Sequence, residues 1–255
     1  MNKEWITELP CTDGQRRNKN TNSKTIAFFL FPELTPLDLV GPATVLEDRG
    51  FNVEYVWHNR EKINTEINSF KLYPSISFDE LEYVDILCVP GALDPFSIMR
   101  DEKAMRWLNK VGKNAEYVTS VCTGSIILAA AGLMNGYKAA THWLMGEYLT
   151  EFGAIPVHER VVIDRNRITG GGITAGIEFG LQLLSILRSE DEAKTMQLIM
   201  HYDPQPPFNA GTPNTAGDKI TKMATDETYQ LLAQKTPDYQ QSIMAAKKFM
   251  EENLC

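Results

Sequence analysis

Short continuous apolar runs that end at Pro or Gly constrain the fold of this chain most. Residues 26–31 (IAFFLF) stop at Pro32, and residues 84–89 (VDILCV) stop at Pro90 and Gly91. Runs of this kind are typical of strands that are buried on both faces. Between them lie segments with apolar residues at helical spacing, such as 101–113. The alternation predicts an α/β fold in which a mostly parallel sheet is sandwiched by helices.

The other elements are predicted from the same patterns. We expect helices at 38–48, 143–152 and 175–187, strands at 51–57, 117–121, 157–163 and 167–169, a buried helix after Gly124, and a hairpin around Pro74 within 67–77. The strands that flank residues 164–166 are joined by a polar turn.

The chain divides into three parts. Residues 12–24 contain no apolar side chain, which predicts a disordered polar tail over 1–24. Residues 25–211 form the predicted α/β domain, and 212–255 contain a linker and two C-terminal helices. Each of these helices has one apolar face but too little core to fold alone, so we expect both to pack on the main domain or on a second subunit. The apolar faces comprise Ile220, Met223 and Leu231 in the first helix, and Tyr239, Ile243 and Met250 in the second.

Charge and composition exclude several functional classes. The 255 residues include 25 Lys and Arg against 33 Asp and Glu, for a net charge of −8. An acidic surface does not favour nucleic acid or an anionic membrane as a partner. The sequence also lacks an apolar run of about 18 residues and an apparent signal peptide, so we expect a cytoplasmic protein. The four Cys lie far apart without a C-x-x-C pair, which predicts neither a metal site nor a disulfide framework.

Cys122 is the strongest candidate for a catalytic residue. It follows the predicted strand 117–121 directly and precedes a helix, with Gly124 two residues on. Ligands of open α/β sheets bind at the carboxyl ends of strands, where a side chain on such a tight turn projects. The partial positive charge of a helix N-terminus would also favour the thiolate. A small buried core cysteine is the alternative, and it is the better interpretation of Cys88 inside the run ILCV.

Two residues are candidate proton partners of the thiol. Asp38 follows the first strand by a short loop and should reach the same edge of the sheet. An Asp at a helix start is equally consistent with an N-cap. His142 could be the base of a Cys-His pair, although a histidine before an aromatic helix start is more often structural.

Backbone groups at the same edge could hold an anion. Gly91 ends its strand and Thr123 starts a helix, so both could offer N–H donors to a developing charge. The run 170–172 (GGG) lacks phosphate-loop spacing and more plausibly lets the backbone approach the site closely.

Several segments together resemble the PfpI/ThiJ superfamily of class I glutamine-amidotransferase-like folds, and within it the isonitrile (isocyanide) hydratases. They are FFLFPELTPLDLVGP (28–42), DILCVPG (85–91), YVTSVCTGSIILAAAGLMNGYKAATHW (117–143), RNRITGGGITAGIEF (165–179) and DPQPPFNAG (203–211). The resemblance covers about 25–211 and implies a flavodoxin-like fold that is usually dimeric.

The resemblance also assigns roles to particular residues. It implies that Cys122 is the nucleophile, that Asp38 is the acid/base partner, and that the backbone of Gly91 and Thr123 forms part of the pocket. The chain has Ala92 where the family commonly has a second glycine, so a donor at this position depends on the backbone angles of Ala92. Thr123 stands where protease-like members have His, which argues against a protease.

The leading functional hypothesis is cofactor-free hydration of a small-molecule isocyanide to an N-substituted formamide. A glyoxalase-like or stress-related enzyme that acts on a dicarbonyl is the second hypothesis, although such a member would be expected to use Glu at the position of Asp38. A ligand-sensing regulator is the third. It would need a DNA-binding unit, and the residues after Gly211 contain no basic recognition helix.

Overall fold

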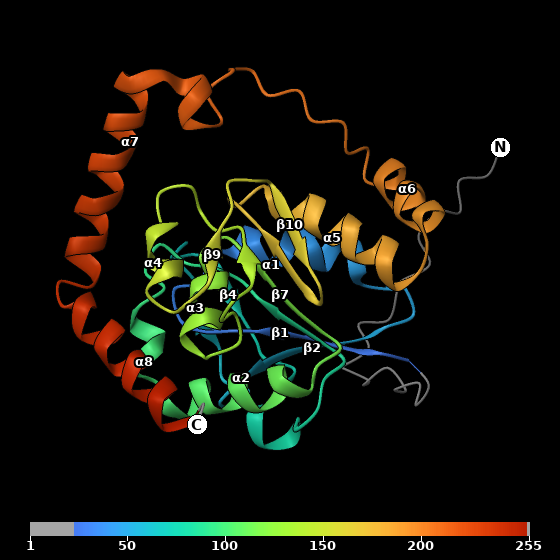
Figure 1. Ribbon diagram of the computed structural model, residues 1–255. Helices are drawn as coiled ribbons and strands as arrows, with labels where there is room; N and C mark the ends of the chain where they lie inside the picture. The colour runs from blue at the N-terminus through green and yellow to red at the C-terminus, as the bar shows by residue number, and fades with distance from the viewer. Residues whose placement is uncertain (1–22, 254–255) are drawn as a thin grey trace.

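The computed structural model describes residues 23–253 and shows a seven-stranded sheet between two layers of helices (Figure 1). The strand order is β10-β11-β7-β6-β1-β2-β5, and every neighbouring pair is parallel except β10 with β11. The strands are β1 (Thr25–Phe29), β2 (Asn52–Trp57), β5 (Ile76–Ser77), β6 (Ile86–Val89), β7 (Tyr117–Val121), β10 (Val161–Asp164) and β11 (Arg167–Gly170). The predicted flavodoxin-like sandwich is confirmed.

Right-handed crossovers place the helices on opposite faces of the sheet. The chain moves one way in the strand order from β1 to β2 and the other way from β6 to β7, so the intervening helices α1 (Pro36–Leu46) and α2 (Glu102–Asn114) lie on different faces. Helix α5 (Ala175–Leu187) packs against α1. Helix α3 (Gly124–Ala130) lies on the same face of the sheet as α2. The Asn109 amide in α2 donates to the Ala131 carbonyl, at the end of α3, at 2.7 Å.

The remaining elements are small or peripheral. They are β3 (Ile63–Asn64) paired with β4 (Lys71–Leu72), β8 (Lys138–Ala139) paired with β9 (Ile155–Pro156), the 3-10 turns η1 (Phe78–Glu80) and η2 (Ser97–Arg100), and the helices α4 (Glu147–Thr150), α6 (Glu190–Ile199), α7 (Pro213–Lys235) and α8 (Tyr239–Asn253). Among the described residues, no helix is long and apolar enough to span a bilayer. The predicted tail falls on residues 1–24, of which 1–22 lie outside the described part.

The central strands are buried because both of their faces are covered by helices. Every residue of β6 and all but the first of β1 are at most 3% exposed. Helix α3 is buried along its whole length, as its all-round apolar sequence predicts. The core therefore lies directly beneath the strand ends that follow β1, β6 and β7.

Three local predictions are wrong. The hairpin predicted around Pro74 does not form, because β4 pairs with β3 while β5 adds in parallel to the edge strand β2. The helix predicted at 143–152 is reduced to the single turn α4. Helix α1 begins at Pro36, two residues earlier than predicted, since proline is well accommodated in the first turn of a helix.

The two C-terminal helices differ in how they contact the main domain. Helix α8 packs onto η2 and α3, as predicted for this helix, and the predicted residues Tyr239, Ile243 and Met250 pack partly buried against the core. The most buried apolar side chains of α8 are Ala246 and Phe249, and Phe249 is not in the predicted face. Helix α7 stands clear of the sandwich for most of its length (Figure 1). Its predicted inward face is exposed, with Ile220 at 46% and Met223 at 58%. Burial of that face against the main domain is therefore wrong for this chain alone.

Helix α8 should contribute to the stability of the main domain. Phe249 is 8% exposed, whereas Met244 on the same helix is 70% exposed. We expect Phe249→Ala to lower the free energy of unfolding by about 3 kcal/mol, and Met244→Ala to change it by less than about 0.5 kcal/mol. Urea unfolding measures both values. Equal effects of the two substitutions would mean that α8 is not docked as described.

Candidate active site

Cys122 occupies a strained turn between β7 and α3. Its φ is +56°, in the left-handed region that non-glycine residues rarely adopt. The Cys122 N–H donates to the Gly170 carbonyl at 3.0 Å, so the turn is fastened to β11. A Cβ at Gly124 would lie 2.1 Å from the Val89 carbonyl oxygen, and only glycine fits there. The turn presents the thiol at the carboxyl edge of the sheet, as the sequence predicts.

Gly91 lets three segments meet beside this thiol. A Cβ on Gly91 would lie 2.6 Å from the backbone nitrogen and from Oγ1 of Thr123, and 2.8 Å from Oδ2 of Asp38. Such distances are far shorter than real contacts allow, so the position requires glycine. The end of β6 can therefore touch both the start of α1 and the turn after β7.

Asp38 lies in the first turn of α1 and is not its N-cap. Thr35 occupies the cap position. The Asp38 side chain is 1% exposed, and its Oδ2 accepts the Gly91 N–H at 2.9 Å. Its Oδ1 is buried and accepts no hydrogen bond from the described residues. The capping interpretation is thus wrong, and one carboxyl oxygen is left available for a proton.

Burial controls the protonation of Asp38. Loss of solvation raises the pKa of its carboxyl from the usual 3.8 to about 7, with a smaller contribution from the negative charge of Glu66. The Gly91 hydrogen bond and the neighbouring Cys122 thiol act in the opposite direction and are weaker. At neutral pH both forms of the carboxyl are therefore populated.

Burial dominates at the thiol as well. Loss of solvation and then the charge of Asp38 hold the pKa of Cys122 well above its usual value, although the Thr123 N–H lowers it. The sequence-based expectation that the helix N-terminus favours the thiolate is therefore wrong for the resting site. The thiol keeps its proton until a base removes it, and Asp38 is the carboxylate in contact with it.

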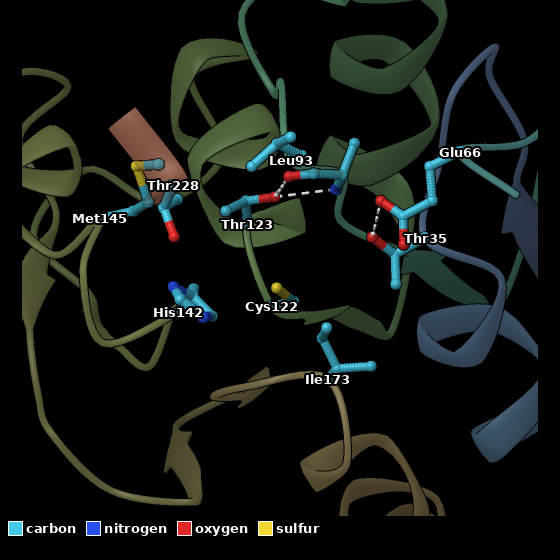
Figure 2. Close-up of a pocket in the computed structure, with 10 residues that line it drawn as sticks. Thr35, Glu66, Leu93, Cys122, Thr123, His142, Met145, Ile173 and Thr228 are labelled. Atoms are coloured by element: carbon cyan, nitrogen blue, oxygen red, sulfur yellow. Dashed lines mark hydrogen bonds between the residues drawn. The ribbon is translucent and has the colours of Figure 1, made fainter. Parts of the chain in front are cut away.

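A cavity of about 250 Å³ opens beside Cys122. Figure 2 shows Thr35 and Glu66 on one side of the sulfur and His142 and Met145 on the other. Its complete lining is Thr35, Glu66, Ala92, Leu93, Cys122, Thr123, His142, Met145, Ile173 and Thr228. The cavity is large enough for a small organic substrate.

His142 reaches this cavity, as a candidate base should, and is partly buried. Burial lowers its pKa, so the imidazole is neutral near pH 7. Among the described residues its side chain makes no hydrogen bond to Cys122 or Asp38, and the thiol interacts with Asp38 instead.

The expected anion hole is arranged differently from the prediction. The Gly91 N–H is donated to Asp38, and the Ala92 N–H is donated to Thr123 Oγ1 at 2.9 Å. Thr123 Oγ1 in turn donates to the Ala92 carbonyl at 2.7 Å. The φ of Ala92 is not positive, so alanine is accommodated without strain. Gly91 and Ala92 thus position the site, and the Thr123 N–H is directed at the Cys122 sulfur.

Cys88 has the structural role that its sequence predicts. It is 3% exposed within β6 and accepts a hydrogen bond from Thr119 Oγ1 at 3.0 Å. Burial raises the pKa of its thiol to about 12. Among the described residues, no group of His, Cys, Asp and Glu is arranged to hold a metal ion.

Sequence reasoning missed several residues of the cavity wall, which are Thr35, Glu66, Leu93, Met145, Ile173 and Thr228. Glu66 lies in the irregular connection between β3 and β4. Its Oε2 accepts a hydrogen bond of 3.0 Å from Thr35 Oγ1. Thr228 comes from α7, outside the predicted α/β domain. Glu66 and Thr228 do not lie near the end of a predicted strand. The charge of Glu66 was therefore the visible signal for these two residues.

Comparison with known proteins assigns the chain and its fold to one family. The model of the DJ-1/PfpI family matches residues 24–186. The chain belongs to the DJ-1/PfpI family. It is 42% identical over 200 residues to isonitrile hydratase of Pseudomonas putida, which covers 78% of this chain and 87% of that protein. The crystal structure of a ThiJ/PfpI family protein from Pseudomonas syringae matches with a TM-score of 0.81 and 33% identity, over 96% of this chain and 98% of the other.

Other relatives in the family are more distant. The HTH-type transcriptional regulator GbdR of Pseudomonas aeruginosa is 28% identical over 175 residues. That match covers 65% of this chain and only 47% of the regulator.

The raised pKa of Asp38 predicts a pH dependence of stability. Its folded pKa of about 7 lies above the usual 3.8, so the stability it contributes is complete at low pH and is lost as pH rises through 7. Relative to Asp38→Asn, the wild type should lose up to about 1.4 kcal/mol per pH unit between about pH 4 and 7. Urea unfolding across this range measures the difference.

The matched control is Asp218→Asn, which removes an exposed carboxyl from α7. Its stability difference from the wild type should be independent of pH. A constant difference for Asp38→Asn as well would show that Asp38 titrates like a solvated carboxyl.

Proposed function

We propose that this protein hydrates isocyanides to N-substituted formamides, with Cys122 as nucleophile and Asp38 as the proton carrier. The observation that carries the proposal is the buried carboxyl of Asp38, which has a pKa of about 7 and interacts with the Cys122 thiol. The backbone of Cys122 is strained, and its thiol faces a small cavity. The 42% identity to isonitrile hydratase of Pseudomonas putida supports it.

The first half of the reaction uses the thiol and the carboxylate together. As the Cys122 sulfur attacks the terminal carbon of R–N≡C, ionised Asp38 takes the thiol proton. The attacked carbon gains an electron pair and must be protonated. Asp38, now an acid beside the sulfur, delivers the proton to that carbon and leaves a thioimidate, R–N=CH–S, on Cys122. The carboxylate is then regenerated.

The second half consumes one water molecule. Asp38 takes a proton from water while the hydroxyl adds to the imidoyl carbon, and the proton passes to the nitrogen. The tetrahedral adduct R–NH–CH(OH)–S collapses when the C–S bond breaks and the hydroxyl proton moves to sulfur. The products are the formamide R–NH–CHO and the free thiol. His142, neutral and on the other side of the cavity, is available to orient the water.

The isocyanide hypothesis predicts distinct effects at the two reacting residues. Cys122→Ser should abolish hydration, because a hydroxyl is far less acidic and less nucleophilic than a thiol. Cys88→Ser, the matched control at a buried cysteine outside the cavity, should keep most of the rate. The loss of the isocyanide infrared band and the appearance of formamide measure turnover. Consumption of a dicarbonyl with isocyanides untouched would favour the glyoxalase-like alternative.

Asp38 variants separate proton transfer from simple positioning. Asp38→Asn keeps an acceptor for the Gly91 N–H but carries no transferable proton, so we expect a rate loss of about 10²-fold to 10⁴-fold. Asp38→Glu retains an acid and should keep part of the activity. An Asn variant as fast as the wild type would exclude Asp38 as the proton carrier, and His142 or water would become the next candidate.

We also propose that the protein acts as a cytoplasmic homodimer. A catalytic thiol without a disulfide partner is best preserved in a reducing compartment. The exposed face of α7 carries Ile220 and Met223 three residues apart, and Leu231 continues the stripe at 42% exposure. An apolar stripe of this kind on the exposed side of a helix favours contact with a second copy.

A paired substitution tests the dimer. The double variant Ile220→Glu and Met223→Glu should dissociate the protein to monomers in sedimentation experiments, because it places charges in the apolar contact. Met244→Glu, at an exposed apolar residue of α8, is the control and should remain dimeric. A monomeric wild type, or a double variant that stays dimeric, would contradict this role of α7.

A further inference from the structure

Glu66 gives the cavity a charged wall that the hydration chemistry does not use. Its backbone N–H donates to the Leu34 carbonyl at 3.2 Å, and its Oε2 accepts from Thr35 Oγ1 at 3.0 Å. The Thr35 N–H donates to the Gly91 carbonyl at 2.9 Å. Glu66 is therefore held by the same backbone that positions Asp38, and its place in the cavity is fixed (Figure 2).

The charge of this carboxylate is not compensated by the protein. Among the described residues, no Lys or Arg forms an ion pair with Glu66, and no basic side chain lines the cavity apart from neutral His142. Lys235, on the helix that supplies Thr228, is paired with Glu33 at 2.8 Å. The negative charge of Glu66 acts on the reacting groups and raises the pKa values of Asp38 and Cys122.

A half-buried carboxylate with a single hydroxyl donor costs solvation free energy unless a further partner arrives. Glu66 lines the cavity of about 250 Å³, so a ligand bound there can supply that partner. The sulfur and Glu66 both face the cavity, so a substrate whose reactive carbon meets the sulfur can direct its other end to Glu66. A cationic group there would supply the missing partner, whereas an anionic group would be repelled.

We propose that Glu66 is a specificity-determining residue that selects isocyanides whose R group carries a positive charge. The proposal rests on the proposed function and names its substrate class. It requires the substituent to be small, with the cationic group separated from the isocyano group by a short linker. Glu66 contacts the substituent and takes no part in the proton transfers, which remain with Asp38.

Isosteric substrates test this selectivity directly. We would compare 2-(trimethylammonio)ethyl isocyanide with its neutral carbon isostere, 3,3-dimethylbutyl isocyanide, and with the anionic 3-isocyanopropanoate. The quaternary ammonium is used because its positive charge does not depend on pH. In the wild type, kcat/KM should be about 10-fold or more higher for the cation than for the neutral isostere, mainly through KM, and lowest for the anion.

The variant Glu66→Gln keeps the shape of the side chain and removes its charge. It should bring kcat/KM for the cation and the neutral isostere within about 2-fold of each other, because the ratio of the two substrates in one variant is independent of any change in the reactivity of Asp38 and Cys122. Glu61→Gln, which removes an exposed carboxylate from the segment just before β3, should retain the wild-type preference. Equal use of both substrates by the wild type, or an unchanged preference in Glu66→Gln, would overturn the proposal.

A binding measurement separates this proposal from the hydratase assignment. By calorimetry, 2-hydroxyethyl-trimethylammonium should bind the wild type more tightly than 3,3-dimethylbutanol, and Glu66→Gln should abolish the difference. If the cation binds in this way but no isocyanide is hydrated, the hydratase assignment fails and the charge selectivity stands. If neutral isocyanides are hydrated without any preference for the cation in rate or binding, the selectivity fails alone.

Discussion

The site depends on Gly91, because a residue with any side chain would not fit at this position. The end of β6 touches the start of α1 and the turn after β7 at distances that leave no room for a Cβ. The same residue donates its N–H to Asp38 Oδ2, and its carbonyl accepts the N–H of Thr35. One glycine thus brings a carboxyl, a thiol and the anchor of Glu66 to the same edge of the sheet.

This close packing also sets the electrostatics of the site. Because Asp38 and Cys122 are withdrawn from water together, both pKa values rise, and the proton is retained between sulfur and carboxyl instead of being lost to solvent. A helix N-terminus alone would have favoured a permanent thiolate. In the mechanism that we propose, the buried pair supplies a base when the sulfur attacks and an acid immediately afterwards, which is the sequence of proton transfers that isocyanide hydration needs.

Local patterns predicted the framework well and the cavity wall poorly. The strands that become β1, β6 and β7 are short apolar runs, and the turn at Cys122 follows from a strand that meets a helix at Gly124. Asp38 could be placed because a short loop limits its reach. Its pKa could not be, since burial arises from packing between distant segments. Glu66 lies in an aperiodic connection and Thr228 on a separate helix, so no pattern along the chain relates either residue to the thiol.

The covalent step is the centre of this account, and rapid-quench mass spectrometry tests it most directly. Wild-type protein quenched in acid during turnover of a slowly hydrated isocyanide should carry an adduct equal to the full mass of the isocyanide, because the thioimidate forms by addition without a leaving group. Peptide mapping should place the adduct on Cys122. Repeated turnover with Cys122 unmodified at every quench time, or an adduct on another residue, would contradict the account.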